Sequence, residues 1–291
     1  LSRWPHPLQL AGLLRAVEQA DGNVHRSKVP IMRELYRIQG RQFEWQRPVF
    51  WKPQFYRNAF IYGQGQSAAF FSERFGISIA DMMYVGFALS ASFLADPVHD
   101  RRQNLDWMNI PRATLDQVLS MISAPLTQVR RQSARDRTSA LEIAYRPSVL
   151  RNFPCIAFGA RGHRLRAPLP ELITWRTTSG LFYDLIDAGG PVRADYGRRF
   201  EEYAKQYFAA MLPQLNQVPE WRYGPAKRSV DTPDFMLLAS DSDDIEIAVE
   251  CKATRMSLQA RFGEKAEEER GYDDMVKGIC QLWRFFSHCR R

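Results

Sequence analysis

The chain has 291 residues, of which 45% are hydrophobic and 12% aromatic, a composition that excludes a disordered protein and suffices for one large or two smaller packed domains. Its formal net charge of +8 favours an anionic partner. The four cysteines lack Cys-x-x-Cys spacing and the five histidines are scattered, which argues against a zinc site and favours a reduced, cytoplasmic chain.

Residues 1–125 carry the periodicity of helices and no sign of a membrane span. The predicted helices are Leu8–Ala20, Ile31–Ile38, Ile79–Ala95 and Leu115–Ile122. Ser78 can cap the third, and Thr114 with Gln117 forms a capping box before the fourth. The third helix is the longest largely apolar stretch, but it is short for a bilayer and contains Asp81. We expect no membrane contact and a helical domain that selects the substrate, a partner protein or a second copy of the chain.

An aromatic segment lies between residues 43 and 56. Its rings are interleaved with Arg47 and Lys52. Such interleaving can stack nucleic-acid bases, whereas aromatic density in a helical domain is also typical of a core. The aromatic residues are Phe43, Trp45, Phe50, Trp51, Phe55 and Tyr56.

Residues 126–195 are rich in arginine and interrupted by proline, and we interpret them as a partly structured connector. Arginine suits bidentate phosphate contacts, although a solvated basic face has the same composition. We expect nucleic-acid contacts from Arg130, Arg131, Arg135 and Arg137. The nine arginines from residue 126 to residue 166 are at positions 130, 131, 135, 137, 146, 151, 161, 164 and 166.

The last third, residues 196–291, begins and ends with helical patterns. Over 196–212 the apolar face comprises Phe200, Tyr203, Ala204, Tyr207, Phe208 and Met211, and Glu201 lies at its rim. Over 265–288 the apolar face comprises Met275, Ile279, Leu282, Trp283 and Phe286. Gln281 points away from that second face, free for a phosphate, a catalytic neighbour or solvent. Between the two helices the periodicity alternates from about Trp221, which predicts a sheet over 218–252.

Two short strands joined by an acidic turn are predicted within residues 230–252. Pro233-Asp234 opens the first strand and Glu250-Cys251-Lys252 closes the second. Because successive strand residues alternate between faces, Glu250 and Lys252 share one side. Two carboxylates converging on one spot repel each other unless a cation lies between them. Asp234, Glu250 and Lys252 therefore suggest a divalent-metal site with an adjacent lysine.

The last third contains a Pro-Asp, a Glu-x-Lys and a helical segment with Gly197, Phe200, Glu201 and Tyr203. Over residues 195–288 these features resemble the PD-(D/E)XK nuclease superfamily. Gln281 is similar to the glutamine of its RecB-like branch. The resemblance implies an α+β or α/β chain whose restriction-endonuclease-like mixed sheet is flanked by helices. One departure is the acidic run from Glu264 to Asp274, which is a poor phosphate surface.

The resemblance also implies a function and a role for each site residue. Asp234, Glu250 and the carbonyl of Cys251 would hold Mg²⁺ or Mn²⁺, and Lys252 would orient the attacking water. Glu201 would complete the outer shell or hold a second ion. The expected activity is metal-dependent phosphodiester hydrolysis, most simply by a DNA endonuclease. A role in restriction or phage defence is expected only by analogy with other proteins of this fold. The alternative is an inactive nucleic-acid-binding or protein-interaction module.

Overall fold

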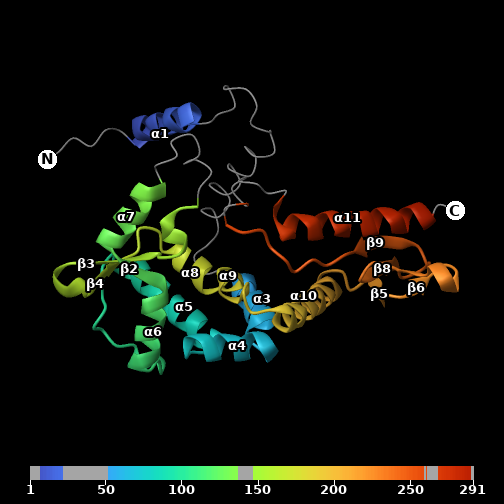
Figure 1. Ribbon diagram of the computed structural model, residues 1–291, viewed down its shortest axis with the longest axis horizontal. Helices are drawn as coiled ribbons and strands as arrows, with labels where there is room; N and C mark the ends of the chain where they lie inside the picture. Colours follow the sequence, from blue (N-terminus) through green and yellow to red (C-terminus); the bar gives the residue numbers. More distant parts are fainter. Residues whose placement is uncertain (1–6, 22–51, 137–146, 259, 261–267, 290–291) are drawn as a thin grey trace.

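The computed structural model describes residues 7–21, 52–136, 147–258, 260 and 268–289, which form an α+β structure (Figure 1). Its earlier α-helices are α1 (Pro7–Asp21), α3 (Lys52–Tyr62), α4 (Gly65–Phe75), α5 (Ile79–Ala95), α6 (Arg112–Ile122), α7 (Leu126–Asp136), α8 (Glu171–Thr177) and α9 (Leu181–Leu185). Short 3₁₀ turns are η2 (Asp106–Met108), η4 (Val149–Arg151), η5 (Ala160–Gly162) and η6 (Ala226–Arg228). The predicted helical N-terminal half is confirmed. The expected helix over 31–38, and residues 43–51 of the aromatic segment, lie outside the described residues.

The helix starts differ in how well the sequence predicted them. At α5 the capping box is present: the Asp81 amide donates to Ser78 Oγ at 3.0 Å, and the Ser78 amide donates to Asp81 Oδ2 at 3.2 Å. At α6 the predicted capping box of Thr114 and Gln117 is wrong, because the helix already begins at Arg112. Pro111 precedes it with a φ of −60°, so the proline ring has set the backbone for helix entry.

A four-stranded sheet lies within the helical half. Its strands are β1 (His99–Asp100), β2 (Ser123–Pro125), β3 (Cys155–Phe158) and β4 (Arg164–Arg166), in the order β1-β4-β3-β2. β2 and β3 pair in parallel, and the other pairs are antiparallel. The predicted boundary at residue 125 therefore crosses a sheet, since β2 lies before it and β3 after it.

The described part of the expected connector, residues 126–195, shares the core of the preceding helices. Cys155, Leu165 and Phe182 are buried in one cluster with residues of α5. On β4, Leu165 is buried while Arg164 and Arg166 are exposed, which is the alternation of a half-buried strand. The arginines and prolines led us to expect a connector. A three-residue strand is also too short for its alternation to be recognised in the sequence.

Helices α5 and α8 approach closely through a glycine. A Cβ added at Gly86 would lie 2.1 Å from Thr177 Oγ1, so no larger residue fits without displacing α8. Thr177 is fully buried and donates its hydroxyl to the Ile173 carbonyl at 3.0 Å. Near this contact the hydroxyls of Ser90 and Thr174 lie 3.1 Å apart, so the polar groups between the helices are partnered.

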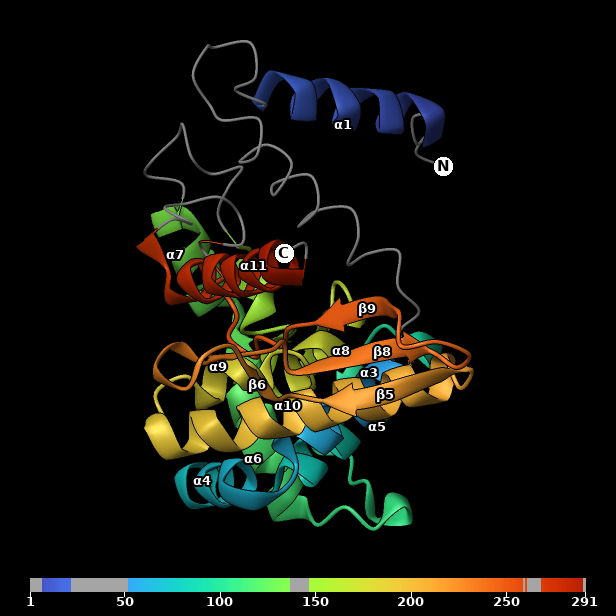
Figure 2. The ribbon, with the colours of Figure 1, turned by 90° about the vertical axis from the view of Figure 1, so that its right-hand side faces the viewer.

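The C-terminal third combines two long helices with small antiparallel sheets (Figure 2). Its elements are α10 (Gly190–Met211), β5 (Leu215–Pro219), β6 (Arg222–Tyr223), β7 (Val230–Asp231), β8 (Phe235–Ala239), β9 (Ile245–Val249) and α11 (Arg270–Cys289). The predicted pairing of the two strands around the acidic turn is confirmed by β8 and β9. The β5-β8-β9 sheet is wholly antiparallel, whereas we expected a mixed sheet; the described parallel pair is β2–β3.

Helix α10 connects the two halves of the molecule. Its first turns belong to the N-terminal core, where Tyr196 meets Tyr62 edge-on with ring centroids 5.8 Å apart. Its last turns cover the sheet, where Phe208 meets Phe235 at 5.7 Å. A helix anchored at both ends sets the position of its middle turn, which carries Glu201 and Lys205.

Among the described residues, no single helix has the length and apolar character to cross a membrane; α4 and α5 meet that criterion as a pair but are bent by 72° at their junction.

Candidate active site

The first acidic residue and the Glu-x-Lys sequence meet at one edge of the β5-β8-β9 sheet. Asp234 directly precedes β8, and Glu250 directly follows β9. Because Phe235 pairs with Val249 in antiparallel register, the next position along brings Asp234 beside Glu250. The amide of Cys251 donates a hydrogen bond to Asp234 Oδ2 at 2.5 Å, which fixes this carboxylate against the end of β9.

Glu250 is the most confined carboxylate of the site. Its side chain is 3% exposed, and Oε1 accepts a hydrogen bond from Lys252 Nζ at 2.5 Å. Its other oxygen, Oε2, is buried and has no hydrogen-bond partner of ordinary geometry among the described residues, although the Asp234 backbone amide lies near enough to lower the pKa of this carboxyl. A buried polar atom without a partner costs about 1–3 kcal/mol, and more when it is charged. With respect to the described residues, Oε2 therefore keeps acceptor capacity that a bound cation could use.

The electrostatic environment disfavours two negative charges at this edge. Burial raises the pKa of Asp234, and the hydrogen bond from the Cys251 amide opposes that rise. Burial also raises the pKa of Glu250, where the hydrogen bond from Lys252 opposes it and the charge of Asp234 adds to it. A cation between the two carboxylates would remove both the repulsion and the desolvation cost.

The Cys251 thiol does not suit a hard cation. Burial, together with the charge of Asp234, raises the pKa of its thiol to about 12. The thiol therefore stays protonated at neutral pH, and the group of Cys251 that suits a hard cation is the backbone carbonyl.

Glu201 lies near this edge but has a partner of its own. Its charge raises the pKa of Asp234, and its Oε1 is 2.5 Å from Lys205 Nζ, one helical turn away on α10. Lys205 also lies 6.0 Å from the centre of the Phe235 ring. Sequence reasoning missed Lys205, although a lysine four residues after a candidate glutamate is the spacing of a helical ion pair.

The donor set fits a hard divalent cation in its chemistry. Carboxylate and carbonyl oxygens are the ligands that Mg²⁺ and Mn²⁺ prefer. The buried Oε2 of Glu250 could bind such an ion, because no described residue gives it a hydrogen bond of ordinary geometry. Within the part of the chain that the structure describes, no three His, Cys, Asp or Glu side chains converge on one point. In this arrangement Lys252 holds Glu250 and Lys205 holds Glu201, so each lysine occupies a carboxylate oxygen that a cation would compete for.

Helix α11 packs on the site through small residues, and the predicted orientation of this helix is wrong. Gly271, Gly278 and Phe285 are buried, while Trp283 is 76% and Ile279 is 62% exposed. A Cβ at Gly278 would lie 3.5 Å from atoms of Glu250 and Lys252, so the glycine lets the helix backbone approach the site. Of the predicted apolar face, Leu282 is half-buried, whereas the other four residues are exposed, namely Met275, Ile279, Trp283 and Phe286.

Gln281 is exposed on α11, and the described residues include no hydrogen bond from it to Asp234, Glu250 or Lys252. The structure therefore does not bring this glutamine to the carboxylates, and its role is still a prediction.

The predicted phosphate-binding arginines lie apart from the carboxylates. Arg130, Arg131 and Arg135 are exposed on α7, and Arg137 lies outside the described residues. Helix α7 and the β5-β8-β9 sheet lie toward opposite ends of the molecule's long axis (Figure 1). Arg151 is unsuited to phosphate binding, because it is buried with its guanidinium 5.4 Å from the centre of the Trp175 ring.

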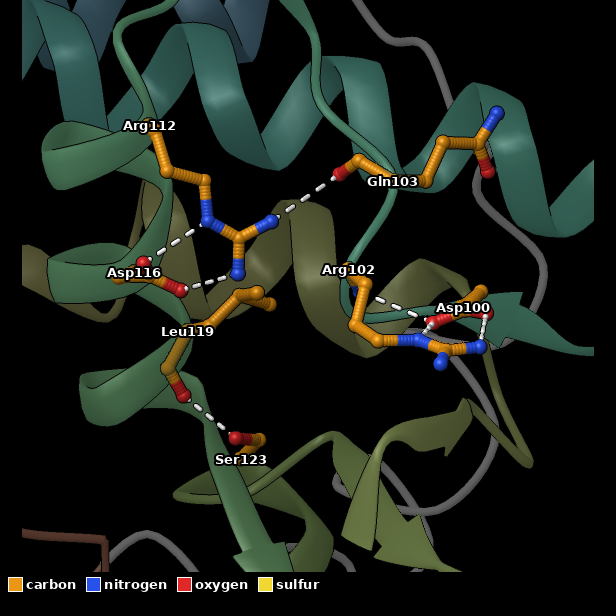
Figure 3. A network of polar contacts seen from close by, with 7 residues as sticks. All are labelled: Asp100, Arg102, Gln103, Arg112, Asp116, Leu119 and Ser123. Atoms are coloured by element: carbon orange, nitrogen blue, oxygen red, sulfur yellow. Dashed lines mark hydrogen bonds and ion pairs between the residues drawn. The ribbon is translucent and has the colours of Figure 1, made fainter.

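Two other polar features have structural explanations. In the first, shown in Figure 3, Arg112 binds Asp116 and Arg102 binds Asp100 through local, solvent-accessible ion pairs. The Arg102 side chain holds the pKa of Asp100 well below its usual range. The second is a cavity of about 430 Å³ whose wall includes the ion pair of Arg176 and Asp184 at 2.7 Å. Neither feature includes a carboxylate of the candidate site.

No family model matches this chain, and comparison with curated proteins and with solved structures finds no significant match.

Proposed function

We propose that this protein is a metal-dependent nuclease that hydrolyses phosphodiester bonds at the edge formed by Asp234, Glu250 and Lys252. The observation that carries the proposal is the buried Oε2 of Glu250, which has no hydrogen-bond partner of ordinary geometry within the described parts of the chain. Asp234 lies next to Glu250, and Lys252 contacts the other oxygen of this carboxylate, Oε1. The order of α10, the antiparallel β5-β8-β9 sheet and α11 supports the resemblance to the PD-(D/E)XK superfamily. A restriction-endonuclease-like fold is part of this proposal.

Asp234, Glu250 and the carbonyl of Cys251 would hold the cation, Mg²⁺ or Mn²⁺. When bound, the cation supplies a Lewis acid that polarises the scissile phosphate and lowers the pKa of a coordinated water. Lys252 orients the attacking water and stabilises the charge that develops on the phosphate. Its side chain is 31% exposed, so it is partly open to a substrate while its ammonium contacts Glu250.

DNA is the proposed substrate, bound through phosphate contacts of the exposed arginines on α7. These contacts would position the strand without reading its sequence. The separation of α7 from the carboxylates along the molecule requires a substrate long enough to reach both. By analogy with restriction and phage-defence effectors, the role proposed for the attached helical half is to select that substrate.

A second candidate function is a binding module without turnover. The feature that favours it is the exposed apolar face of α11, which is typical of a protein-interaction surface, together with carboxylates that lysines already neutralise. Retention of Asp234, Glu250 and Lys252 at one edge favours the enzyme instead, because a binding module has no need for all three.

The deciding experiment incubates the full chain with plasmid DNA, single-stranded DNA and RNA, each with Mg²⁺, Mn²⁺ or EDTA. We expect cleavage of DNA with Mg²⁺ or Mn²⁺ and none with EDTA. Asp234→Asn and Glu250→Gln should abolish cleavage, and Asp231→Asn, an exposed carboxylate paired with Arg222, is the matched control. Binding without cleavage under all conditions would support the second candidate.

A further inference from the structure

One face of the four-stranded sheet in the helical half is basic. On β4, Arg164 and Arg166 are exposed on one side, while Leu165 is buried on the other. In the β3–β4 register, Phe158 lies opposite Arg164 and Ile156 lies opposite Arg166, and both apolar side chains are half-buried. Because directly paired residues of neighbouring strands share a face, the two arginines lie beside an aromatic ring and an aliphatic side chain on one surface.

Acidic side chains do not neutralise this face. The sequence contains no aspartate or glutamate from residue 143 to residue 170. Asp100 lies opposite Arg164 in β1, but its carboxylate accepts hydrogen bonds from the Arg102 guanidinium at 2.6 and 3.0 Å. Among the described residues, the guanidinium groups of Arg164 and Arg166 make no hydrogen bond or ion pair. The face therefore keeps a positive charge that an anionic ligand could neutralise.

The turn between β3 and β4 adds a third exposed arginine next to these strands. Arg161 has a φ of 61°, and Gly159 and Gly162 on either side of it have φ of 79° and 65°. The left-handed region is strained for a residue with a side chain, and such residues cluster at ligand sites. A Cβ added at Gly159 would lie 3.7 Å from Cδ of Arg164, so the stem of Arg164 runs along this turn.

The basic face lies at the same end of the molecule as the arginines of α7. The strand order is β1-β4-β3-β2, and α7 packs against β2 and β3. Figure 1 shows α7, β3 and β4 together at one end of the long axis. One strand of nucleic acid can therefore contact both α7 and the sheet.

The aromatic ring on this face distinguishes between the forms of nucleic acid. In a duplex the bases are stacked on one another, so arginines contact mainly the phosphates. In a single strand the bases can stack on aromatic side chains while cationic side chains follow the backbone. Phe158, directly opposite Arg164, places a ring beside a guanidinium and so suits a single strand.

We propose that the β3–β4 face binds single-stranded nucleic acid, with phosphates on Arg161, Arg164 and Arg166 and a base stacked on Phe158. This inference rests on the proposed function for the class of substrate and specifies its form as single-stranded. The carboxylate edge lies toward the other end of the molecule, so variants of this face leave the candidate active site intact (Figure 1).

The test measures the affinity of the full chain for labelled oligodeoxythymidylate, oligouridylate and duplex DNA by fluorescence anisotropy, over a salt series in EDTA. The double variant Arg164→Ala/Arg166→Ala should weaken single-strand binding and flatten the slope of log affinity on log salt by about 0.7 for each lost phosphate contact. The double variant Arg74→Ala/Arg198→Ala is the matched control. It removes the same charge from exposed positions on α4 and α10 and should leave the slope unchanged.

Variants of Phe158 test the stacking. Phe158→Leu should weaken single-strand binding by about fivefold or more, with the salt slope and the duplex affinity unchanged. Phe158→Tyr keeps the ring and should bind like the wild type. Thermal melting would show that each variant is folded. Binding of oligouridylate alone would support this face and contradict DNA as the substrate.

Each outcome decides one of the two proposals. Equal salt slopes of the two double arginine variants would overturn the role of this face, even in a protein that cleaves DNA. An unchanged single-strand affinity of Phe158→Leu, or an equal loss for single strand and duplex, would overturn the stacked single strand. The expected binding in a protein that cleaves no nucleic acid would support this face and overturn the nuclease. A wild type that binds none of the three nucleic acids would overturn this face, whatever the cleavage assay shows.

Discussion

Lys252 lies with its ammonium 2.5 Å from Oε1 of Glu250, while Oε2 of the same carboxylate is buried and accepts no hydrogen bond of ordinary geometry from the residues that the structure describes. The ammonium of Lys252 therefore pairs with one of the two oxygens of a carboxylate that is almost completely buried. An ion pair of this kind leaves the remaining oxygen for a cation and places the ammonium next to it. Binding and chemistry at this edge are consequently separable by mutation.

Lys252→Ala should abolish cleavage while leaving Mn²⁺ affinity equal to or higher than that of the wild type. The ammonium is no metal ligand, and its removal frees Glu250 Oε1 for the cation. Cleavage at saturating Mn²⁺ and Mn²⁺ affinity are the two measurements. Full activity of the variant under metal saturation would show that Lys252 has no catalytic role.

Asp234→Asn should stabilise the metal-free protein against heat at neutral pH. The pKa of Asp234 is raised in the folded state, so the folded state binds more protons than the unfolded state from about pH 4 upward. Wild-type stability is therefore expected to fall as pH rises through this window, and the loss is complete above the folded-state pKa. The variant, which lacks the titrating group, should lose less.

Melting midpoints of the wild type and Asp234→Asn across pH 4 to 8 measure this difference, with Asp231→Asn as the control. Mg²⁺ should raise the midpoint of the wild type more than that of Asp234→Asn. An identical response of both proteins to pH would mean that Asp234 is not held in an unfavourable environment.

Gly86→Ala should destabilise the protein by about 1–3 kcal/mol or more, because the added methyl would overlap the Thr177 side chain. Gly197→Ala is the matched control, since a Cβ there has no neighbour within 4 Å and the residue is inside α10. Alanine should stabilise that helix by up to about 1 kcal/mol. Chemical denaturation of the three proteins measures both effects, and equal stabilities would contradict the close approach of α5 and α8.

The triple variant Arg130→Ala, Arg131→Ala and Arg135→Ala should bind all DNA sequences more weakly and with a shallower salt dependence. Each phosphate contact contributes about −0.9 to the slope of log affinity on log salt for duplex DNA. Arg102→Ala is the control, because that exposed arginine is already neutralised by Asp100. Cleavage at saturating DNA should persist. An unchanged slope would leave α7 as a solvated basic face.

Local sequence patterns were reliable where the deciding interactions are local. The predicted Ser78 cap of α5 depends on residues three positions apart, and the β8–β9 pair depends on an acidic turn between alternating strands. The same reasoning identified Asp234, Glu250 and Lys252, because a Pro-Asp and a Glu-x-Lys at adjacent strand ends need only a hairpin to meet. The helix start at Arg112 was missed, because Pro111 begins the helix ahead of the predicted Thr114 cap.

By itself, the sequence determined that helices combine with a sheet, that the first half is helical and that Asp234 and Glu250 meet at adjacent strand ends, because backbone periodicity and hairpin geometry act over a few residues; the choice of α+β over α/β came from the structure. Tertiary structure alone decided which face of α11 is buried: Gly278 lets the helix approach Glu250, and the apolar face, with Trp283, stays outside. It also decided that Arg151 is buried against Trp175. These relationships join residues far apart in the chain, and close packing selects among them by shape, which no local pattern records.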